Sequence, residues 1–252
     1  MFDYSAAKNL LEQRVILVTG ASSGIGKDAA ICYAQHGATV ILLGRVSSKL
    51  ETVYDEIENQ GLAQPAIYTL DLESAQAEDY DQLGASLEQE FSQLDGLLHN
   101  ASLLGERRLL EQTSPSSWQQ VMQVNIDAPF MLTRTLMPLM RQAKHASVVF
   151  TSSSVGRKGR AYWGAYAISK FATEGMMEVL ADELESVSNV RVNSLNPGAT
   201  NTSMRRAAYP AEEPSTNPSP EAIMPAYLYL MGDASIGQTG KRWDAQQGQA
   251  PL

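Results

Sequence analysis

The sequence predicts an α/β protein of the doubly wound, Rossmann type: a mostly parallel sheet of about seven strands with helices on both faces. Apolar, β-branched runs alternate with longer segments of helical periodicity along most of the chain, as in parallel folds. The runs are almost continuously apolar, for example TVILLG at 39–44, which is typical of strands buried on both faces. The first run leads into a glycine-rich loop, VTGASSGIG, where such folds bind phosphate groups.

The order of elements follows from these runs and from the residues that interrupt them. We expect strands at 14–20, 39–44, 65–72, 94–101, 146–153, 190–198 and 241–244. Helices are expected at 24–38, 47–61, 76–92, 115–142, 164–187 and 220–231. Gly37 and Gly61 are helix stop signals, and Ser114 followed by Pro115 predicts a helix start. Right-handed crossovers then bring the strands into one sheet.

The chain shows no internal repeat and no interior linker, so we expect a single domain over 1–252. The exception is an irregular segment at 203–219, which contains three prolines and no periodicity. A segment of this length in a compact domain is either a functional lid on the substrate side or a surface insertion.

Composition narrows the possible partners and location. The net charge is −9, and the short basic stretches RRAAYP and GRKGR do not form the basic patch that nucleic acid or anionic membranes require. No apolar run approaches the ~20 residues of a membrane span, and the N-terminus lacks the pattern of a signal peptide. With Cys32 as the only cysteine, we expect a cytoplasmic protein with a small-molecule substrate and no metal site.

The loop after the first strand is a candidate phosphate site. Gly20, Gly24 and Gly26 lie at the first strand–helix junction, where glycines let the backbone turn tightly and approach a pyrophosphate. Free N–H groups at the start of the following helix attract the anion. An ordinary tight turn is the alternative.

The end of the second strand indicates which dinucleotide binds. A carboxylate there would favour NAD, but Gly44 and Arg45 occupy this position. An arginine can form a forked, charge-assisted contact with a 2′-phosphate, so we expect NADP(H) to be preferred and NAD(H) to be possible. Asp71, at the end of the third strand, could bind the adenine amino group or cap a local turn.

Tyr166 and Lys170, in GAYAISKF, lie four residues apart in the predicted helix 164–187 and therefore share one helix face. They could be a packed aromatic ring and a surface lysine. Alternatively, the lysine cation could lower the pKa of the phenol and make it a usable acid or base.

These stretches together resemble the short-chain dehydrogenase/reductase family, in its single-domain branch, over essentially the whole chain. The residues that carry the resemblance are TGASSGIG (19–26), LDL (70–72), HNA (99–101), VNIDAPF (124–130), TSSSVG (151–156), YAISK (166–170) and NPGATNT (196–202). Finer details, such as KFATEGMMEVLADE and the tail MGDASIGQTG, look like the YciK-like group, whose substrates are poorly defined.

The resemblance implies four catalytic residues. Tyr166 would be the acid in reduction and the base in oxidation, and Lys170 would lower its pKa and hold the nicotinamide ribose. Ser153 would hydrogen-bond the substrate oxygen, and Asn125, in the long helix, would keep a helix backbone open for a proton relay. Independently of the family, Ser153 falls at the carboxyl end of a strand, where ligands of open α/β sheets bind.

The resemblance and the glycine loop together give a set of expected cofactor-binding residues. They are Gly20, Ser22, Ser23, Gly24, Ile25, Gly26, Arg45, Asp71, Leu72, Asn100, Ala101, Tyr166, Lys170, Pro197, Gly198 and Thr202. Among the departures from the family pattern, Ser102 replaces a glycine and His99 replaces an asparagine. We expect His99 to be a half-buried strand residue, and Ser102 either to crowd the cofactor loop or to turn outward.

The predicted activity is hydride transfer between NADP(H) and a carbonyl or secondary alcohol. The alternatives are a catalytically silent NADP(H)-binding regulator of the same fold and a partner-binding module. The family also leads us to expect a homodimer or homotetramer. An apolar stripe at Met176, Val179, Leu180 and Leu184 would either form the interface or cover the molecule's own sheet.

Overall fold

The architecture is known from a computed structural model, which describes residues 1–246. Residues 247–252, which belong to the predicted domain, lie outside the described residues. Seven parallel strands form one sheet in the order β3-β2-β1-β4-β5-β6-β7. The doubly wound fold expected from the sequence is confirmed. The strands are β1 (Val15–Thr19), β2 (Thr39–Gly44), β3 (Ala66–Thr69), β4 (Gly96–His99), β5 (Ala146–Thr151), β6 (Val190–Asn196) and β7 (Lys241–Asp244).

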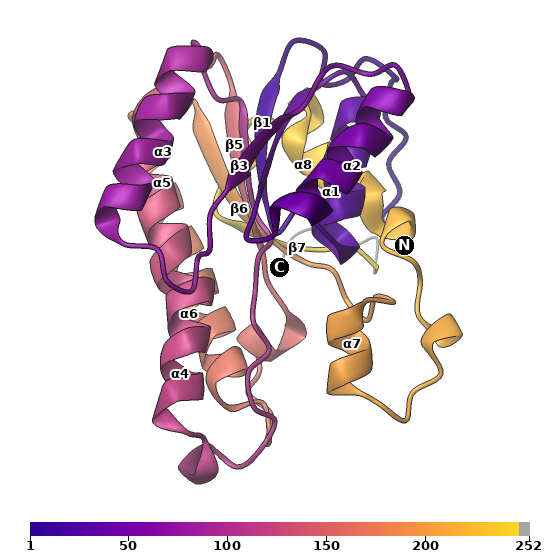
Figure 1. Ribbon diagram of the computed structural model, residues 1–252, viewed down its shortest axis with the longest axis vertical. Helices are drawn as coiled ribbons and strands as arrows, with labels where there is room; N and C mark the ends of the chain where they lie inside the picture. Colours follow the sequence, from indigo (N-terminus) through magenta and orange to yellow (C-terminus); the bar gives the residue numbers. More distant parts are fainter. Residues whose placement is uncertain (247–252) are drawn as a thin grey trace.

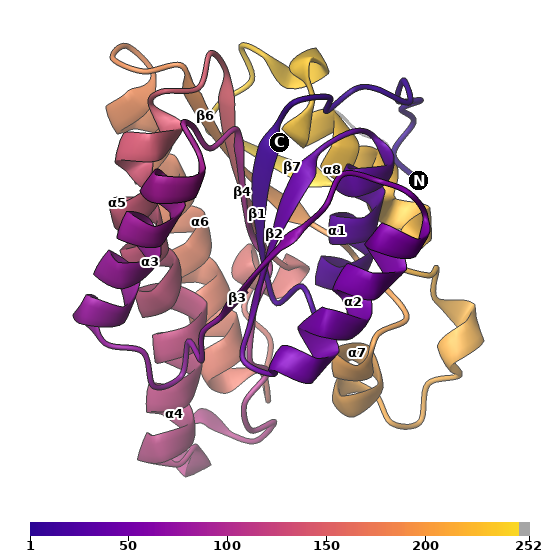
Figure 2. The same ribbon diagram turned by 45° about the horizontal axis from the view of Figure 1, so that its top comes forward.

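Helices cover both faces of the sheet. They are α1 (Gly24–Gln35), α2 (Ser47–Asn59), α3 (Ala77–Glu90), α4 (Pro115–Met122), α5 (Ala128–Met140), α6 (Gly164–Leu184), α7 (Ser203–Ala208) and α8 (Met224–Met231). Figures 1 and 2 show α1, α2 and α8 on one side of the sheet, and α3, α4, α5 and α6 on the other.

Strand side chains alternate between two hydrophobic cores, one on each face. In β1, Ile16 and Val18 belong to the core that includes α1 and α8, whereas Leu17 belongs to the core that includes α3, α5 and α6. The same alternation occurs in β2, with Val40 and Ile41 on opposite sides. Because successive strand residues point to opposite faces, a continuous apolar run is what a sheet covered on both faces requires.

Several predicted boundaries were wrong. The third strand was expected over 65–72 but leaves the sheet after Thr69, and the fifth ends at Thr151 rather than at 153. The single helix expected over 115–142 is α4 and α5 joined by a π-helical turn, η2 (Gln123–Asp127). Polar residues at the strand ends follow the sheet without belonging to it.

The segment 203–219 is less irregular than predicted. Ser203–Ala208 form α7, a short helix whose first turn is capped by the Thr202 side chain, which accepts a hydrogen bond from Arg205 N at 3.1 Å. A six-residue helix shows no apolar periodicity, so its signal in the sequence is the threonine cap alone. In both views α7 and the chain that follows it project beyond the sheet (Figures 1 and 2).

Candidate active site

A cleft of about 430 Å³ lies at the carboxyl ends of the strands. The order of the sheet reverses between β1 and β4, and the loops that leave these two strands diverge there and open the crevice in which such folds bind ligands. The predicted site residues that line it are Gly20, Ser22, Ser23, Gly24, Ile25, Arg45, Asp71, Leu72, Asn100, Ala101, Tyr166, Lys170, Pro197 and Thr202. The predicted residues Gly26, Asn125, Ser153 and Gly198 are not among its lining residues.

The glycine loop depends on two close backbone approaches. Gly20 has φ +67°, and a Cβ there would lie 3.0 Å from Ala101 Cα. A Cβ on Gly26 would lie 2.3 Å from the Gly20 carbonyl oxygen, so only glycine lets α1 approach the loop this closely. Gly26 therefore supports the cleft from behind instead of lining it.

The start of α1 can receive an anion. Ser23 is its N-cap residue, but the serine side chain makes no capping hydrogen bond, and the first turn holds no acidic residue. The N–H groups of this turn therefore keep their positive field for a ligand. A pyrophosphate fits this arrangement of residues.

Thr19, which the sequence reading missed, connects the loops on the two sides of the crevice. Its Oγ1 accepts hydrogen bonds from Asn100 N at 2.9 Å and Ala101 N at 3.0 Å. The same hydroxyl donates to Leu98 O at 3.2 Å. This buried hydroxyl fixes the β4 loop against the glycine loop, and a threonine directly before the first glycine is the only signal of it in the sequence.

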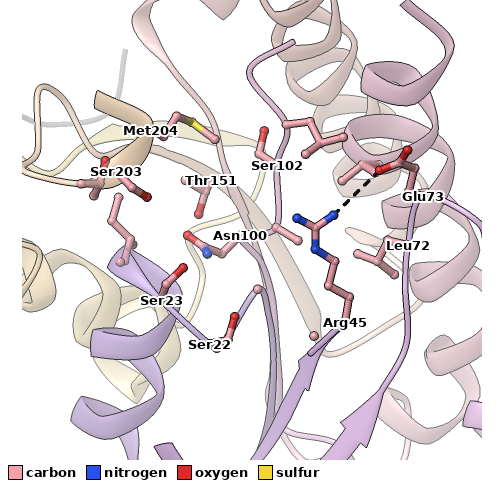
Figure 3. Close-up of a pocket in the computed structure, with 18 of the residues that line it drawn as sticks. Ser22, Ser23, Arg45, Leu72, Glu73, Asn100, Ser102, Thr151, Ser203 and Met204 are labelled. Carbon is pink, nitrogen blue, oxygen red and sulfur yellow. Dashed lines mark ion pairs between the residues drawn. The ribbon is translucent and has the colours of Figure 1, made fainter. Parts of the chain in front are cut away.

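Two cations line the cleft where β2 ends. Arg45 is exposed, and its Nη1 lies 3.9 Å from Glu73 Oε2 across the cleft (Figure 3). An exposed ion pair at this distance is weak, so the guanidinium can exchange Glu73 for a phosphate. Lys49, on α2, also lines the cleft and was not predicted. Asp71 accepts a hydrogen bond from Glu73 N at 3.1 Å, so it forms the local turn and also faces the cleft.

The two departures from the family pattern have different surroundings. Ser102 lines the cleft, and its buried Oγ has no hydrogen-bond partner among the described residues. His99 is fully buried, not half-buried as predicted: it stacks on Phe150, its Nε2 contacts Thr133 Oγ1 at 2.9 Å, and burial lowers its pKa to about 3. His99 is therefore a neutral core residue that does not reach the cleft.

Tyr166 and Lys170 meet at the floor of the cleft. The Lys170 Nζ lies 5.5 Å from the centre of the Tyr166 ring and donates to Thr151 O at 2.8 Å. The pKa of Tyr166 is raised to about 12 by burial, with a hydrogen bond to Ser153 acting in the lowering direction. Burial also lowers the pKa of Lys170 to about 8.

The sequence predicted that Lys170 lowers the pKa of the Tyr166 phenol. This prediction was wrong for the protein alone, because the pKa of Tyr166 is raised. Lys170 directs its ammonium group to a backbone carbonyl and is itself desolvated, so its field does not offset the burial of Tyr166. At neutral pH the arrangement favours a protonated phenol, which is the form that can donate a proton.

Ser153 forms a hydrogen bond with Tyr166, and Asn125 contacts the same helix at Ser169. Ser153 follows β5 and caps the short 3₁₀ helix η3 (Ser154–Gly156). Asn125 lies in the π-helical turn, where its Oδ1 accepts from Leu103 N at 2.8 Å and its Nδ2 donates to Ser169 Oγ at 2.9 Å. Asn125 thus fastens the loop after β4 to the helix that carries Tyr166.

A cluster of aromatic and basic side chains, which we call the α7 clasp, joins the α7 segment to the rest of the molecule. The Arg107 guanidinium lies 4.3 Å from the Trp163 ring centre and 5.1 Å from that of Tyr209. Arg205 lies 3.9 Å from the Tyr209 ring centre and pairs with Glu212 at 2.6 Å. These contacts, absent from the predicted site, join the loop after β4, the start of α6 and the segment that contains α7.

The remaining cleft residues were not predicted as ligand-binding. They are Gly44, Val46, Lys49, Leu70, Glu73, Ser102, Leu103, Val124, Thr151, Ser152, Ser203 and Met204. Within residues 1–246, no group of three or more His, Cys, Asp or Glu side chains could hold a metal ion. None of the helices in this range is both long and apolar enough to cross a membrane.

Comparisons with known proteins agree with this geometry. The chain matches the short chain dehydrogenase family over residues 14–213. It is 52% identical over 248 residues to the uncharacterized oxidoreductase YciK of Escherichia coli (strain K12), covering 98% of each chain. The structure superimposes on a short chain dehydrogenase from Pseudomonas syringae with a TM-score of 0.94 and 59% identity, covering 98% of this chain and 100% of the other.

A second solved structure is a short chain dehydrogenase from Escherichia coli CFT073 in complex with NADPH. It gives a TM-score of 0.93 at 53% identity and covers 96% of this chain and 100% of the other. With the glycine loop, the parallel sheet and the Tyr166–Lys170 pair, these matches show that the chain is an oxidoreductase of the short-chain dehydrogenase/reductase family.

Proposed function

We propose that this protein is an NADP(H)-dependent oxidoreductase that reversibly converts a carbonyl compound and the corresponding secondary alcohol. The observation that supports this most directly is the position of Tyr166 and Lys170 in the cleft that begins at the glycine loop. One end of the cleft suits a pyrophosphate, and the other holds a phenol, an ammonium group and, close by, the Ser153 hydroxyl.

The cofactor would be held by main-chain groups at one end and by cations along the side. The start of α1 and the glycine loop would bind the pyrophosphate, and Asn100, Ala101, Pro197 and Thr202 would lie along the rest of the dinucleotide. Arg45 and Lys49 support NADP(H) because both cations lie where β2 ends, which is where a 2′-phosphate would be bound. The NADPH complex of a 53% identical relative supports the same choice, and NAD(H) remains a second possible cofactor.

The residues of the chain would supply the proton and the electrostatics. When bound, the nicotinamide supplies or accepts the hydride. Tyr166 would donate its phenolic proton to the carbonyl oxygen during reduction and take it back during oxidation. The Ser153 hydroxyl would donate a hydrogen bond to the same oxygen, where negative charge develops. Lys170 would keep a positive charge beside the phenol while its ammonium group is fixed by Thr151 O.

The test is Tyr166→Phe, which removes the acidic hydroxyl and keeps the ring. A panel of carbonyl substrates is followed by NADPH absorbance, and turnover should fall by about a hundred- to ten-thousandfold, with NADPH affinity retained. Tyr162→Phe is the matched control, because Tyr162 lies four residues earlier and is 55% exposed. Full activity of Tyr166→Phe would contradict the assignment, and NADPH binding without turnover of any substrate would favour the regulator.

We also propose a homo-oligomer built on α5 and α6, which lie on the same side of the sheet (Figure 1). Phe130 of α5 and Phe171 of α6 are 54% and 46% exposed. The predicted stripe divides: Val179 is 59% exposed, whereas Leu184 is buried in the molecule's own core. Light scattering should give at least twice the chain mass, and a monomer would contradict this proposal. We further propose a cytoplasmic location, which fractionation of cells would test.

A further inference from the structure

Three consecutive residues where β5 ends, Thr151, Ser152 and Ser153, each form a hydrogen bond with a different side chain on one face of α6. The Thr151 carbonyl oxygen accepts a hydrogen bond from the Lys170 ammonium group, and Ser153 forms a hydrogen bond with Tyr166. Between them, Ser152 donates its hydroxyl proton to Glu174 Oε1 at 2.5 Å. Glu174 lies four residues after Lys170, which lies four after Tyr166, so the three side chains form a row along the helix. The proposed mechanism uses the first two members of this row and leaves the third without a role.

Glu174 is a buried carboxylate with a complete set of partners. Its side chain is 2% exposed, and its second oxygen, Oε2, accepts from Ser194 Oγ of β6 at 2.6 Å. Arg157, after β5, and Arg242, of β7, place their Nε atoms 3.7 Å and 3.5 Å from its two oxygens. A carboxylate that is buried this far needs hydrogen-bond donors and cations around it.

The two arginines also have partners of their own beyond Glu174. Arg157 pairs with Asp244 at 2.7 Å, and Arg242 pairs with Glu178 of α6. The Arg157 loop approaches α6 closely because Gly156 has no side chain: a Cβ there would lie 2.8 Å from Lys170 O. The charged groups around Glu174 are thus Lys170 on its own helix, Arg157 from the loop after β5 and Arg242 from β7, with Asp244 and Glu178 behind the arginines.

We propose that Glu174 is a positioning residue that keeps Lys170 protonated beside Tyr166, an inference that rests on the proposed function. Glu174 reaches neither the cleft nor the phenol. It acts through Lys170, by placing a negative charge one helical turn behind an ammonium group that burial would otherwise neutralise.

The direction of the effect follows from the charges. Burial lowers the pKa of Lys170, and the charge of Glu174 acts in the opposite direction. Without that carboxylate, the row would hold no anion, and the burial of Lys170 would act unopposed. The ammonium group would then lose its proton at a lower pH, and a neutral lysine cannot support Tyr166. A glutamate that served only to pack α6 on the sheet would leave the titration of Lys170 unchanged.

The experiment measures the titration of Lys170 directly. Protein with ¹³C-labelled lysine is titrated by NMR, and the Lys170 signal is assigned from its absence in Lys170→Met. Glu174→Gln keeps the shape of the side chain and removes the charge, so the Lys170 pKa should fall by roughly one unit or more. Glu178→Gln is the matched control: it is one turn further along α6, 53% exposed and also paired with Arg242. It should leave the titration within a few tenths of a unit.

Activity gives a second readout. The alkaline limb of the kcat/KM profile should move to lower pH in Glu174→Gln by the same amount, with Glu174→Asp closer to the wild type. An unchanged Lys170 titration in Glu174→Gln would overturn the inference, even if Tyr166→Phe abolishes turnover as the proposed function requires. Conversely, a shifted titration in a protein with no turnover would preserve the inference about Lys170 and refute the function.

Loss of folding in Glu174→Gln would not prevent the test. Arg242→Gln changes a more exposed side chain and removes a cation that partly neutralises Glu174. The charge of Glu174 should then act more strongly on Lys170, so the Lys170 pKa should rise. A Lys170 pKa that stays constant or falls in Arg242→Gln would overturn the inference in that case.

Discussion

The two ends of the cleft are built in opposite ways. The phosphate end consists of main chain: the glycine loop, the start of α1 and the loop after β4, which Thr19 holds in place. Its two cations, Arg45 and Lys49, belong to residues that are largely exposed. The other end, which we call the catalytic end after its proposed role, consists of side chains: Tyr166 and Lys170 are buried, and Glu174 is buried behind them.

This difference decides how each end responds to change. Main-chain recognition depends on close approach, so a single added methyl group can disturb it. Buried charges depend on their neighbours, so replacing one changes the proton affinity of the others. We therefore expect changes at the phosphate end to alter cofactor binding and changes at the catalytic end to alter pH dependence.

The largest effect is expected for Gly26→Ala. The added Cβ would lie 2.3 Å from the Gly20 carbonyl oxygen, so the loop and α1 must separate. Binding of NADPH, measured by the change in its fluorescence, should weaken by roughly a hundredfold. Gly175→Ala is the control, since no atom lies within 4 Å of its added Cβ. Tight binding by Gly26→Ala would show that the loop adapts and that the two ends differ less than we infer.

A smaller effect is expected for Arg45→Ser. The change removes a charged partner for the 2′-phosphate, so the preference for NADPH over NADH should fall by about tenfold. The ratio of the two dissociation constants is the measurement, and affinity for NADH should hardly change. Arg206→Ser, at an exposed arginine that does not line the cleft, should leave the ratio unaltered. An unchanged ratio in Arg45→Ser would leave Lys49 as the residue to test.

The smallest effect concerns stability and belongs to the catalytic end. The folded-state pKa of Lys170, about 8, lies below the unfolded value of about 10.4. The unfolded chain therefore holds more protons between these values, so the charged lysine destabilises the fold below pH 8, and this loss is relieved as pH rises. Lys170→Met should be more stable at pH 7 by a few degrees in melting temperature.

The advantage of Lys170→Met should shrink as pH rises from about 8 to about 10. Because both proteins carry the same other titrating groups, the difference between their melting temperatures isolates Lys170. If the difference in melting temperature stayed constant across this range, Lys170 would not be desolvated. The catalytic end would then not depend on a buried charge, as we infer that it does.

The sequence predicted the phosphate end better than the catalytic end. The glycine spacing, the alternation of strands and helices and the position of Arg45 can be read directly from the sequence, and with the short motifs from TGASSGIG to NPGATNT they were sufficient to identify the fold, the family and most of the cleft. The strand ends were placed too late because polar residues such as Asp71 follow a strand without pairing in it.

Other features could not be predicted because they depend on contacts between distant residues. Glu174 looks like a solvent-facing glutamate in the sequence, and its burial depends on Ser152, Ser194 and two arginines from other elements. Likewise, the pKa of Tyr166 is set by burial that no motif encodes. The π-helical turn at Asn125 interrupts a periodicity that looks continuous in the sequence.

The α7 clasp has a consequence for the choice of substrate. Met204 of α7 and Trp163 both pack on the small apolar cluster that contains Tyr166, and Arg107 joins Trp163 to Tyr209 beyond α7. The α7 segment and the proposed proton donor, Tyr166, thus pack on one small apolar support. We therefore expect engineered variants in which this support is loosened to accept a wider range of substrates at a lower rate, because the same change would loosen the proposed acid.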